Sequence, residues 1–115
     1  MKFLFTLILT FSFTSVCFSD YSNFAIPTQI DVDRDSGVMI WGSFGNGGSC
    51  AISNQLYVKR DHPQYKEIYA TALAAMLGKY RIRAYVHGCE PVLWYSAAEN
   101  TFNVVYSYAT LSIAE

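Results

Sequence analysis

The sequence lacks the motifs of the commonest catalytic sites. It contains no G-x-S-x-G nucleophile elbow, no H-E-x-x-H zinc motif and no glycine-rich loop that ends in Gly-Lys-Ser or Gly-Lys-Thr. Only His62 and His87 could join the cysteines in a zinc site, and His62 stands at the start of a predicted helix. We therefore expect a protein that is not an enzyme and that holds no metal or cofactor.

Charged residues are also scarce, and neither sign dominates. Eight Lys and Arg face nine Asp and Glu, and charged residues make up 15% of the chain. Such a balance gives no electrostatic footprint for nucleic acid or for an acidic membrane. Aromatic residues, in contrast, are frequent. Nine Tyr and two Trp offer flat apolar faces with a polar tip, which suit protein or sugar interfaces, although such residues also build cores.

Long apolar runs are missing as well. The longest, residues 3–13, is too short to cross a bilayer, which takes roughly 20 apolar residues. It follows Lys2 and gives way to a polar segment, as the apolar region of a secretory signal peptide does. We expect residues 1–19 to be a signal peptide that is cleaved at the Ser19-Asp20 junction; a retained N-terminal anchor is the alternative. Residues 20–115 would then be one secreted or periplasmic domain without a membrane span.

Cysteine is rare, and Cys17 falls within the predicted signal peptide. The remaining pair, Cys50 and Cys89, indicates one disulfide in an exported chain. The bond would close a loop of about 40 residues and stabilise the fold by on the order of 4 kcal/mol in the chain-entropy model.

The apolar pattern has a period of two in most of the chain and changes to 3.6 once. Period-two segments predict strands over residues 26–33, 38–44, 50–58, 80–86 and 102–113. Residues 88–91 are expected to end the fourth of these strands, and a short strand is added over residues 92–95. The helical segment spans Pro63 to Leu77. Asp61 is its expected N-cap, Gln64 would complete a capping box, and Gly78 is its expected stop.

The predicted helix has one apolar face and an outer face that becomes poor in charge towards its end. The apolar face, which we expect to be buried, comprises Tyr65, Ile68, Tyr69, Ala72, Leu73 and Met76. Ala74 and Leu77 point the other way. A weakly polar outer face suits a subunit of a homo-oligomer; an ordinary small helix is the alternative.

The resulting element order, β-β-β-α-β-β, gives a fold that is mainly β with one helix. Three strands, a helix and two further strands are the order of the OB-fold, a small Greek-key barrel. We favour an OB-fold-like barrel because the helix follows the third strand and the strands are short. A sheet packed on one helix, as in cystatins, is the alternative.

The strand over residues 80–86 and the segment after it provide the best candidates for a ligand-binding surface. The candidate residues are Arg81, Arg83, Tyr85, His87, Trp94 and Tyr95. The first four share the outer face of the strand. Stacking and hydrogen bonds from such residues suit a glycan or a cell-surface receptor, so we expect a non-enzymatic binding module. Simple cation–π pairing is the structural alternative. The functional alternative is an exported enzyme or enzyme inhibitor that uses the same surface.

The stretch from His62 to Cys89 also resembles part of a known family. It carries a helix with the pattern Y-K-x-x-Y-x-x-x-L-A-A, a glycine turn and a strand that ends in Gly-Cys. These features are similar to those of the B subunits of subtilase-cytotoxin and typhoid-toxin type AB5 toxins, whose V-R-I-Y strand is matched by residues 82–85. The resemblance implies an OB-fold, a pentameric ring and binding of sialylated glycans.

The chain departs from this family in two respects. The toxin subunits carry a disulfide within their early strands, whereas here the expected bond joins Cys50 to Cys89. The serine and tyrosine that hold the glycan in the family have no secure counterparts in this sequence. The resemblance therefore transfers no glycan contact, and Tyr85 is a motif match alone.

Overall fold

The computed structural model describes residues 20–33, 35–106 and 110–115, so the predicted signal peptide lies outside the described residues. Within these ranges the chain is mainly β with one helix, as the sequence predicts. The elements are β1 (Asp20–Tyr21), β2 (Gln29–Asp33), β3 (Gly37–Trp41), β4 (Gln55–Lys59), α1 (Tyr65–Gly78), β5 (Arg81–Val86), β6 (Gly88–Pro91), β7 (Thr101–Val104) and β8 (Leu111–Ala114).

One sheet has five strands in the order β2-β3-β4-β7-β6. Neighbouring strands run antiparallel except β4 and β7, which are parallel. In both β3 and β4, the first four of the five residues are buried. Because side chains alternate between the two faces of a sheet, this burial means that both faces of the sheet are covered at its centre.

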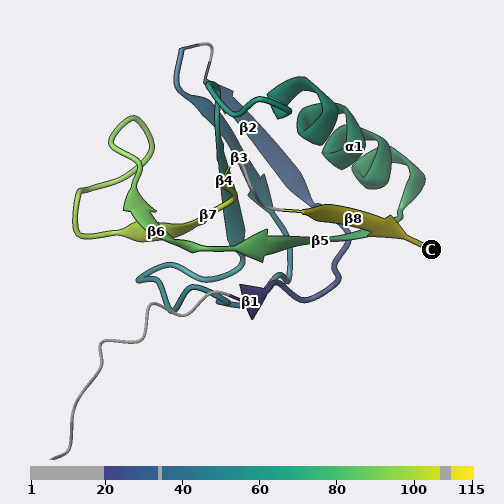
Figure 1. Cartoon of the computed structure of the whole chain (residues 1–115), viewed down its shortest axis with the longest axis horizontal. Coiled ribbons are helices and arrows are strands. Elements are labelled where there is room, and N and C mark those ends of the chain that lie inside the picture. The colour runs from purple at the N-terminus through teal and green to yellow at the C-terminus, as the bar shows by residue number, and fades with distance from the viewer. Residues whose placement is uncertain (1–19, 34, 107–109) are drawn as a thin grey trace, which may run out of the picture.

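The second sheet has three antiparallel strands in the order β1-β5-β8. Only His87 separates β5 from β6, so one stretch of chain pairs with β8 in this sheet and then with β7 in the other. Figure 1 shows this green stretch running from β5 across the molecule to β6. An isolated bridge joins Ala25 to Ile82 of β5. Among the described residues, the two sheets do not form a closed barrel.

The five-stranded sheet has a hydrophobic core on each face. The larger core lies against α1 and the three-stranded sheet, and its members include Val38, Ile40, Phe44, Leu56, Val58, Ile68, Ala72, Ala75, Ile82, Ala84, Val86 and Val105. The smaller core consists of Met39, Tyr57, Val92, Phe102 and Val104, with Trp41, Trp94 and Tyr95 packed against it. Alternate residues of β3 therefore serve different cores.

The helix α1 packs against β2, β5 and β8 and covers one end of the larger core (Figure 1). Its fully buried residues are Ile68, Ala72 and Ala75. The predicted apolar face is thus rotated slightly, because Leu73 and Met76 are only partly buried while Ala75 is buried. Small residues at 72 and 75 let the helix approach the sheet closely.

The helix ends differ from the prediction at the N-terminus only. Gln64, rather than Asp61, is the N-cap residue, and no side chain caps the helix there. His62 takes part of this role, because its Nδ1 atom accepts a 3.0 Å hydrogen bond from the Gln64 backbone N–H. At the other end the helix stops at Gly78, as expected, and Lys79 adopts the left-handed conformation with φ of 58°.

Several predicted strand limits are wrong. Residues 88–91, expected to end a strand, form β6, while residues 92–95, expected to be a strand, form a turn against the smaller core. The third strand begins at Gln55 instead of residue 50, because the segment before Gln55 is joined to β6 through the Cys50–Cys89 disulfide. The predicted last strand is divided into β7 and β8, which belong to different sheets; residues 107–109 lie outside the described residues.

Candidate functional site

The outer side of β5 holds four of the six candidate residues. The inward residues of the strand are fully buried, whereas Arg81, Arg83, Tyr85 and His87 lie on the opposite side, so the predicted alternation is confirmed. Two further aromatic residues come from the N-terminal segment. The β5 face, as we define it, consists of Tyr21, Phe24, Arg81, Arg83, Tyr85 and His87.

Strand β1 brings Tyr21 to the β5 face. Tyr21 is the direct cross-strand partner of Tyr85, and their rings meet edge to face with centroids 4.8 Å apart. Edge-to-face contact is a favoured geometry for aromatic pairs. Sequence patterns did not indicate Tyr21 or Phe24, because both precede the first predicted strand and only long-range pairing places them beside β5.

Arg83 lies at the centre of the β5 face. Its guanidinium carbon is 4.3 Å from the ring centroid of Tyr21 and 4.6 Å from that of Phe24, within the range of cation–π attraction. Both rings remain partly open to solvent, with exposed fractions of 41% and 36%. No carboxylate forms an ion pair with Arg83 within the described part of the chain. The face therefore combines a positioned cation with accessible aromatic surface.

Arg81 and His87, the other two nitrogen-bearing side chains of the β5 face, have different environments. Arg81 donates hydrogen bonds of 3.2 Å from Nε and 2.6 Å from Nη2 to the backbone oxygen of Glu115. His87 lies against Tyr85, with ring centroids 4.4 Å apart. Desolvation by burial lowers the pKa of His87 below its ordinary value, so its ring is neutral at pH 7. The positive charge of the β5 face thus comes from its two arginines.

Trp94 and Tyr95 do not join the β5 face. Both pack against the smaller core, on the other face of the five-stranded sheet. The Tyr95 hydroxyl donates a 2.7 Å hydrogen bond to Oδ2 of Asp31, and the Trp41 Nε1–H lies 2.6 Å from the Tyr95 oxygen and 3.0 Å from the same Oδ2 atom. The structure therefore divides the six candidate residues between two separate surfaces.

Asp31 and Tyr95 shift each other's protonation. Desolvation would raise the pKa of Asp31, but hydrogen bonds from Tyr95, Gln29 and Trp41 outweigh it and lower this pKa below its ordinary value. Burial, together with the hydrogen bond to Asp31, raises the pKa of Tyr95 to about 12. At neutral pH the pair is therefore an ionised carboxylate that accepts from a neutral phenol.

This arrangement predicts an acid-sensitive contribution to stability. Because the pKa of Asp31 is lower in the folded chain than in the unfolded chain, its contribution is present above the ordinary pKa of about 3.9 and is lost as pH falls through the folded value. Urea unfolding of wild type and Asp31→Asn should show wild type more stable at pH 6, with a gap that narrows steadily towards pH 3. A gap that is independent of pH would contradict the assigned hydrogen bonds.

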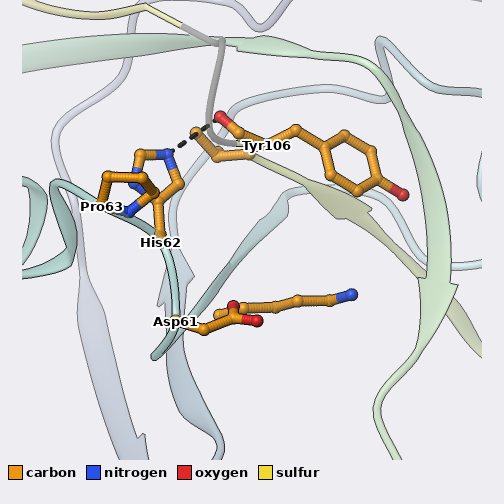
Figure 2. Close-up of a pocket in the computed structure, with 6 residues that line it drawn as sticks. Asp61, His62, Pro63 and Tyr106 are labelled. Carbon is orange, nitrogen blue, oxygen red and sulfur yellow. Dashed lines mark hydrogen bonds between the residues drawn. The ribbon is translucent and has the colours of Figure 1, made fainter.

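A pocket of about 300 Å³ lies beside the start of α1 and is lined by Lys59, Asp61, His62, Pro63, Val105 and Tyr106. Figure 2 shows that His62 points across it to the backbone of Tyr106, at 2.9 Å from Nε2 to the carbonyl oxygen. Since Nδ1 accepts a hydrogen bond from the Gln64 N–H, the ring proton is on Nε2, which donates a hydrogen bond to the Tyr106 carbonyl oxygen. Both ring nitrogens are thereby used to hold the chain, and His62 is not available as a general base.

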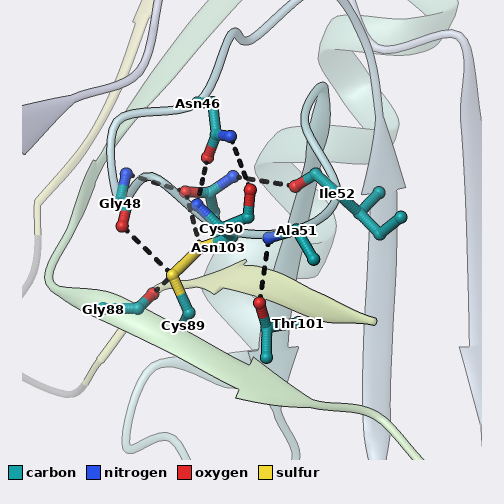
Figure 3. Close-up of a disulfide and its surroundings, with 9 residues drawn as sticks. All are labelled: Asn46, Gly48, Cys50, Ala51, Ile52, Gly88, Cys89, Thr101 and Asn103. Atoms are coloured by element: carbon teal, nitrogen blue, oxygen red, sulfur yellow. Dashed lines mark hydrogen bonds between the residues drawn. A yellow bond between two sulfur atoms is a disulfide. The ribbon is translucent and has the colours of Figure 1, made fainter. Parts of the chain in front are cut away.

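The Cys50–Cys89 disulfide predicted from the sequence is present and joins the loop before β4 to β6. Figure 3 shows the surrounding loop, in which the Asn46 side chain bonds both the N–H and the carbonyl of Cys50 at 2.7 and 2.8 Å. Asn103, 1% exposed, accepts a 2.8 Å bond from the Gly48 N–H. The bonded sulfurs carry no proton, so the dashed contacts of the two sulfur atoms with oxygens of Gly48, Gly88 and Asn103 in Figure 3 are packing contacts. This cluster supports structure and presents no reactive thiol.

Comparisons with known proteins give no further guide, since no family model, curated protein or solved structure matches the chain. In the part of the chain that the structure covers, no group of three His, Cys, Asp or Glu residues is placed to hold a metal ion. The same residues include no helix that is long and apolar enough to cross a membrane.

Proposed function

We propose that the chain is a non-enzymatic, secreted or periplasmic module that binds acidic glycans on its β5 face. The observation that carries the proposal is Arg83, a guanidinium held against two partly exposed rings and unpaired with any described carboxylate. Aromatic rings suit the apolar faces of sugar rings, and a guanidinium fits a carboxylate with two parallel hydrogen bonds. An acidic sugar offers both groups.

The proposed fold is an OB-fold-like barrel, and its strand pairing supports this assignment. In such a barrel the third strand must pair in parallel with the last, as β4 and β7 do. The fourth strand must pair with the last strand, as the β5–β6 stretch does with β7 and β8, and Ala25, which precedes β2, bridges to Ile82 of β5.

Two observations favour binding over catalysis. His62 is occupied at both ring nitrogens, and the two cysteines outside residues 1–19 are joined to each other. The disulfide also suits an oxidising compartment, such as the bacterial periplasm or the extracellular space. A protein in such a compartment can reach glycans presented at a cell surface, and an acidic glycan of this kind is the proposed ligand.

A change that removes the charge of Arg83 tests the ligand class. Arg83→Gln should weaken binding of a sialylated oligosaccharide by about tenfold to a hundredfold, because a charge-assisted contact contributes about 1.5–3 kcal/mol. Arg60→Gln is a matched control, since Arg60 is exposed and outside the β5 face. Titration calorimetry measures both affinities, and thermal unfolding checks that both variants fold. Equal loss in the two variants would show a general charge effect and refute the proposed site.

The outer side of α1 supports self-association. Ala74 and Leu77 are exposed, as the sequence predicts, and Leu77 is 75% accessible. Tyr80 and Ile113 add exposed fractions of 42% and 48% near the helix end and on β8. Exposed apolar patches of this kind mark interaction surfaces. Several copies in one assembly would also convert weak single-site sugar binding into useful avidity.

Ala74→Glu should therefore dissociate the oligomer without unfolding the protomer, because the side chain points away from the core. Multi-angle light scattering at tens of micromolar should give a multiple of the protomer mass for wild type and the protomer mass for the variant. Ala98→Glu, at an exposed loop position, should leave the wild-type mass unchanged. A wild-type protein that is monomeric at this concentration would refute self-association.

A further inference from the structure

A groove distinct from the β5 face lies at one end of the five-stranded sheet. It has a volume of about 340 Å³, and its lining includes Thr28, Trp41, Ser43, Ser53, Asn54 and Gln55. This volume is at the lower end of the range, roughly 300–1,000 Å³, in which proteins hold small ligands. The groove is formed where β3 ends and β4 begins, so rigid strands supply two of its residues.

The ring of Trp41 is held in place by its strand neighbours and by hydrogen bonds of its indole N–H. Register pairs Gln29 with Trp41 and Trp41 with Gln55, so these three side chains form a row on one face of the sheet. The indole N–H is shared between Asp31 and Tyr95 at 3.0 and 2.6 Å, which fixes the orientation of the ring. A fixed, half-buried indole beside an open groove is a ready stacking surface.

Asn54 and Thr28 use their side chains within the fold, because Asn54 Oδ1 accepts from the Gly45 N–H and the Thr28 hydroxyl donates to the Trp41 carbonyl. Other polar groups of the groove are not used in this way. Gln55 is only 9% exposed, yet its Oε1 atom has no hydrogen-bond partner among the described residues. The hydroxyls of the exposed Ser43 and Ser53 likewise take part in no hydrogen bond within those residues. Buried polar groups in native proteins are nearly always paired, and Gln55 both lines the groove and has an unpaired amide oxygen. This oxygen is itself covered, so a partner in the groove would bond it once the amide turns about its Cγ–Cδ bond.

The chemistry of the lining narrows that partner. No lining residue carries a charge, and the Asp31 carboxylate, which accepts from the Trp41 indole, lies next to the groove lining. An anionic ligand would be repelled, and Gln55 requires a group that donates a hydrogen bond. We propose that this groove binds a neutral saccharide, stacked on Trp41, with a hydroxyl or acetamido N–H donating to the Gln55 side chain.

Gln55→Met tests the proposal, since it keeps the length of the side chain and removes the amide. The chain has two tryptophans, so the ¹H–¹⁵N spectrum of the exported protein should contain two indole signals, which Trp94→Phe assigns. Titration with neutral oligosaccharides built from galactose, mannose, glucose or N-acetylglucosamine should shift the Trp41 signal and leave the Trp94 signal in place. Affinity should fall about tenfold in Gln55→Met, the effect of one lost hydrogen bond.

The matched control is Gln64→Met, the same change at an exposed position outside the groove, which should bind like wild type. Arg83→Gln should also leave this affinity unchanged, so failure here is distinguishable from failure of the β5 face. The thermal midpoint of Gln55→Met should be equal to or above that of wild type, because an unpaired buried oxygen is removed. If no neutral saccharide shifts the Trp41 signal, or if Gln55→Met binds as well as wild type, the proposal is overturned.

Discussion

Removing the disulfide in the double variant Cys50→Ala/Cys89→Ala should lower the free energy of unfolding by about 2–5 kcal/mol. The bond joins residues that are 39 positions apart in the sequence, so its loss frees a long loop in the unfolded state. It also releases the segment before β4 from β6. In a domain of this size, whose total stability is of the order of 5–15 kcal/mol, such a loss is large.

Chemical denaturation followed by circular dichroism measures this change, with the reduced wild-type protein as a second reference. Both alanines replace cysteines together, so no free thiol confuses the result. The reduced wild type and the double variant should unfold at similar denaturant concentrations, both well below the oxidised protein. A double variant as stable as oxidised wild type would show that the hydrogen bonds of Asn46 and Asn103 hold the loop without the disulfide.

Phe44→Ala should destabilise the protein by about 3–5 kcal/mol, the range for removing a large buried aromatic side chain. Phe44 is 1% exposed and lies in the larger core. Its backbone carbonyl accepts a 2.9 Å hydrogen bond from Asn23, between the two aromatic residues that the N-terminal segment adds to the β5 face. Loosening this position should therefore affect the proposed glycan site as well as the core.

Leu93→Ala is the matched control, because Leu93 is 73% exposed and its truncation should change stability by less than about 0.5 kcal/mol. Phe44→Leu should recover a large part of the stability lost in Phe44→Ala, since it leaves a smaller cavity. Denaturant midpoints of the three variants give the comparison. Phe44→Ala with a midpoint like that of Leu93→Ala would mean that Phe44 does not occupy the core as described.

Local patterns predicted the elements that depend on local physics. The alternation along β5, the helix end at Gly78 and the exposure of Ala74 and Leu77 all follow from side-chain period and capping chemistry. The disulfide followed from cysteine number and an inferred exported location. These features need no knowledge of which distant segments meet.

The features that were missed depend on pairing between distant residues. Tyr95 lies far from the β5 face because its hydroxyl binds Asp31, 64 positions earlier in the sequence. The Gly and Pro of residues 88–91 predicted the end of a strand, yet pairing with β7 makes these residues a strand. The row that contains Trp41 and Gln55 likewise appears only when strand register is known. Neither a periodic pattern nor a local motif carries this information.

The most direct test of the proposed function compares two glycans that differ only in a terminal acidic sugar. Titration calorimetry of the purified Gln55→Met protein, in which the proposed groove site is weakened, should show binding of the acidic glycan at least about tenfold tighter than its neutral counterpart, as one charge-assisted contact to Arg83 requires. The preference should shrink as salt is raised, because the β5 face is open to solvent. Equal affinity for the two glycans, or no measurable binding of the acidic one, would contradict the assignment of the β5 face as an acidic-glycan site.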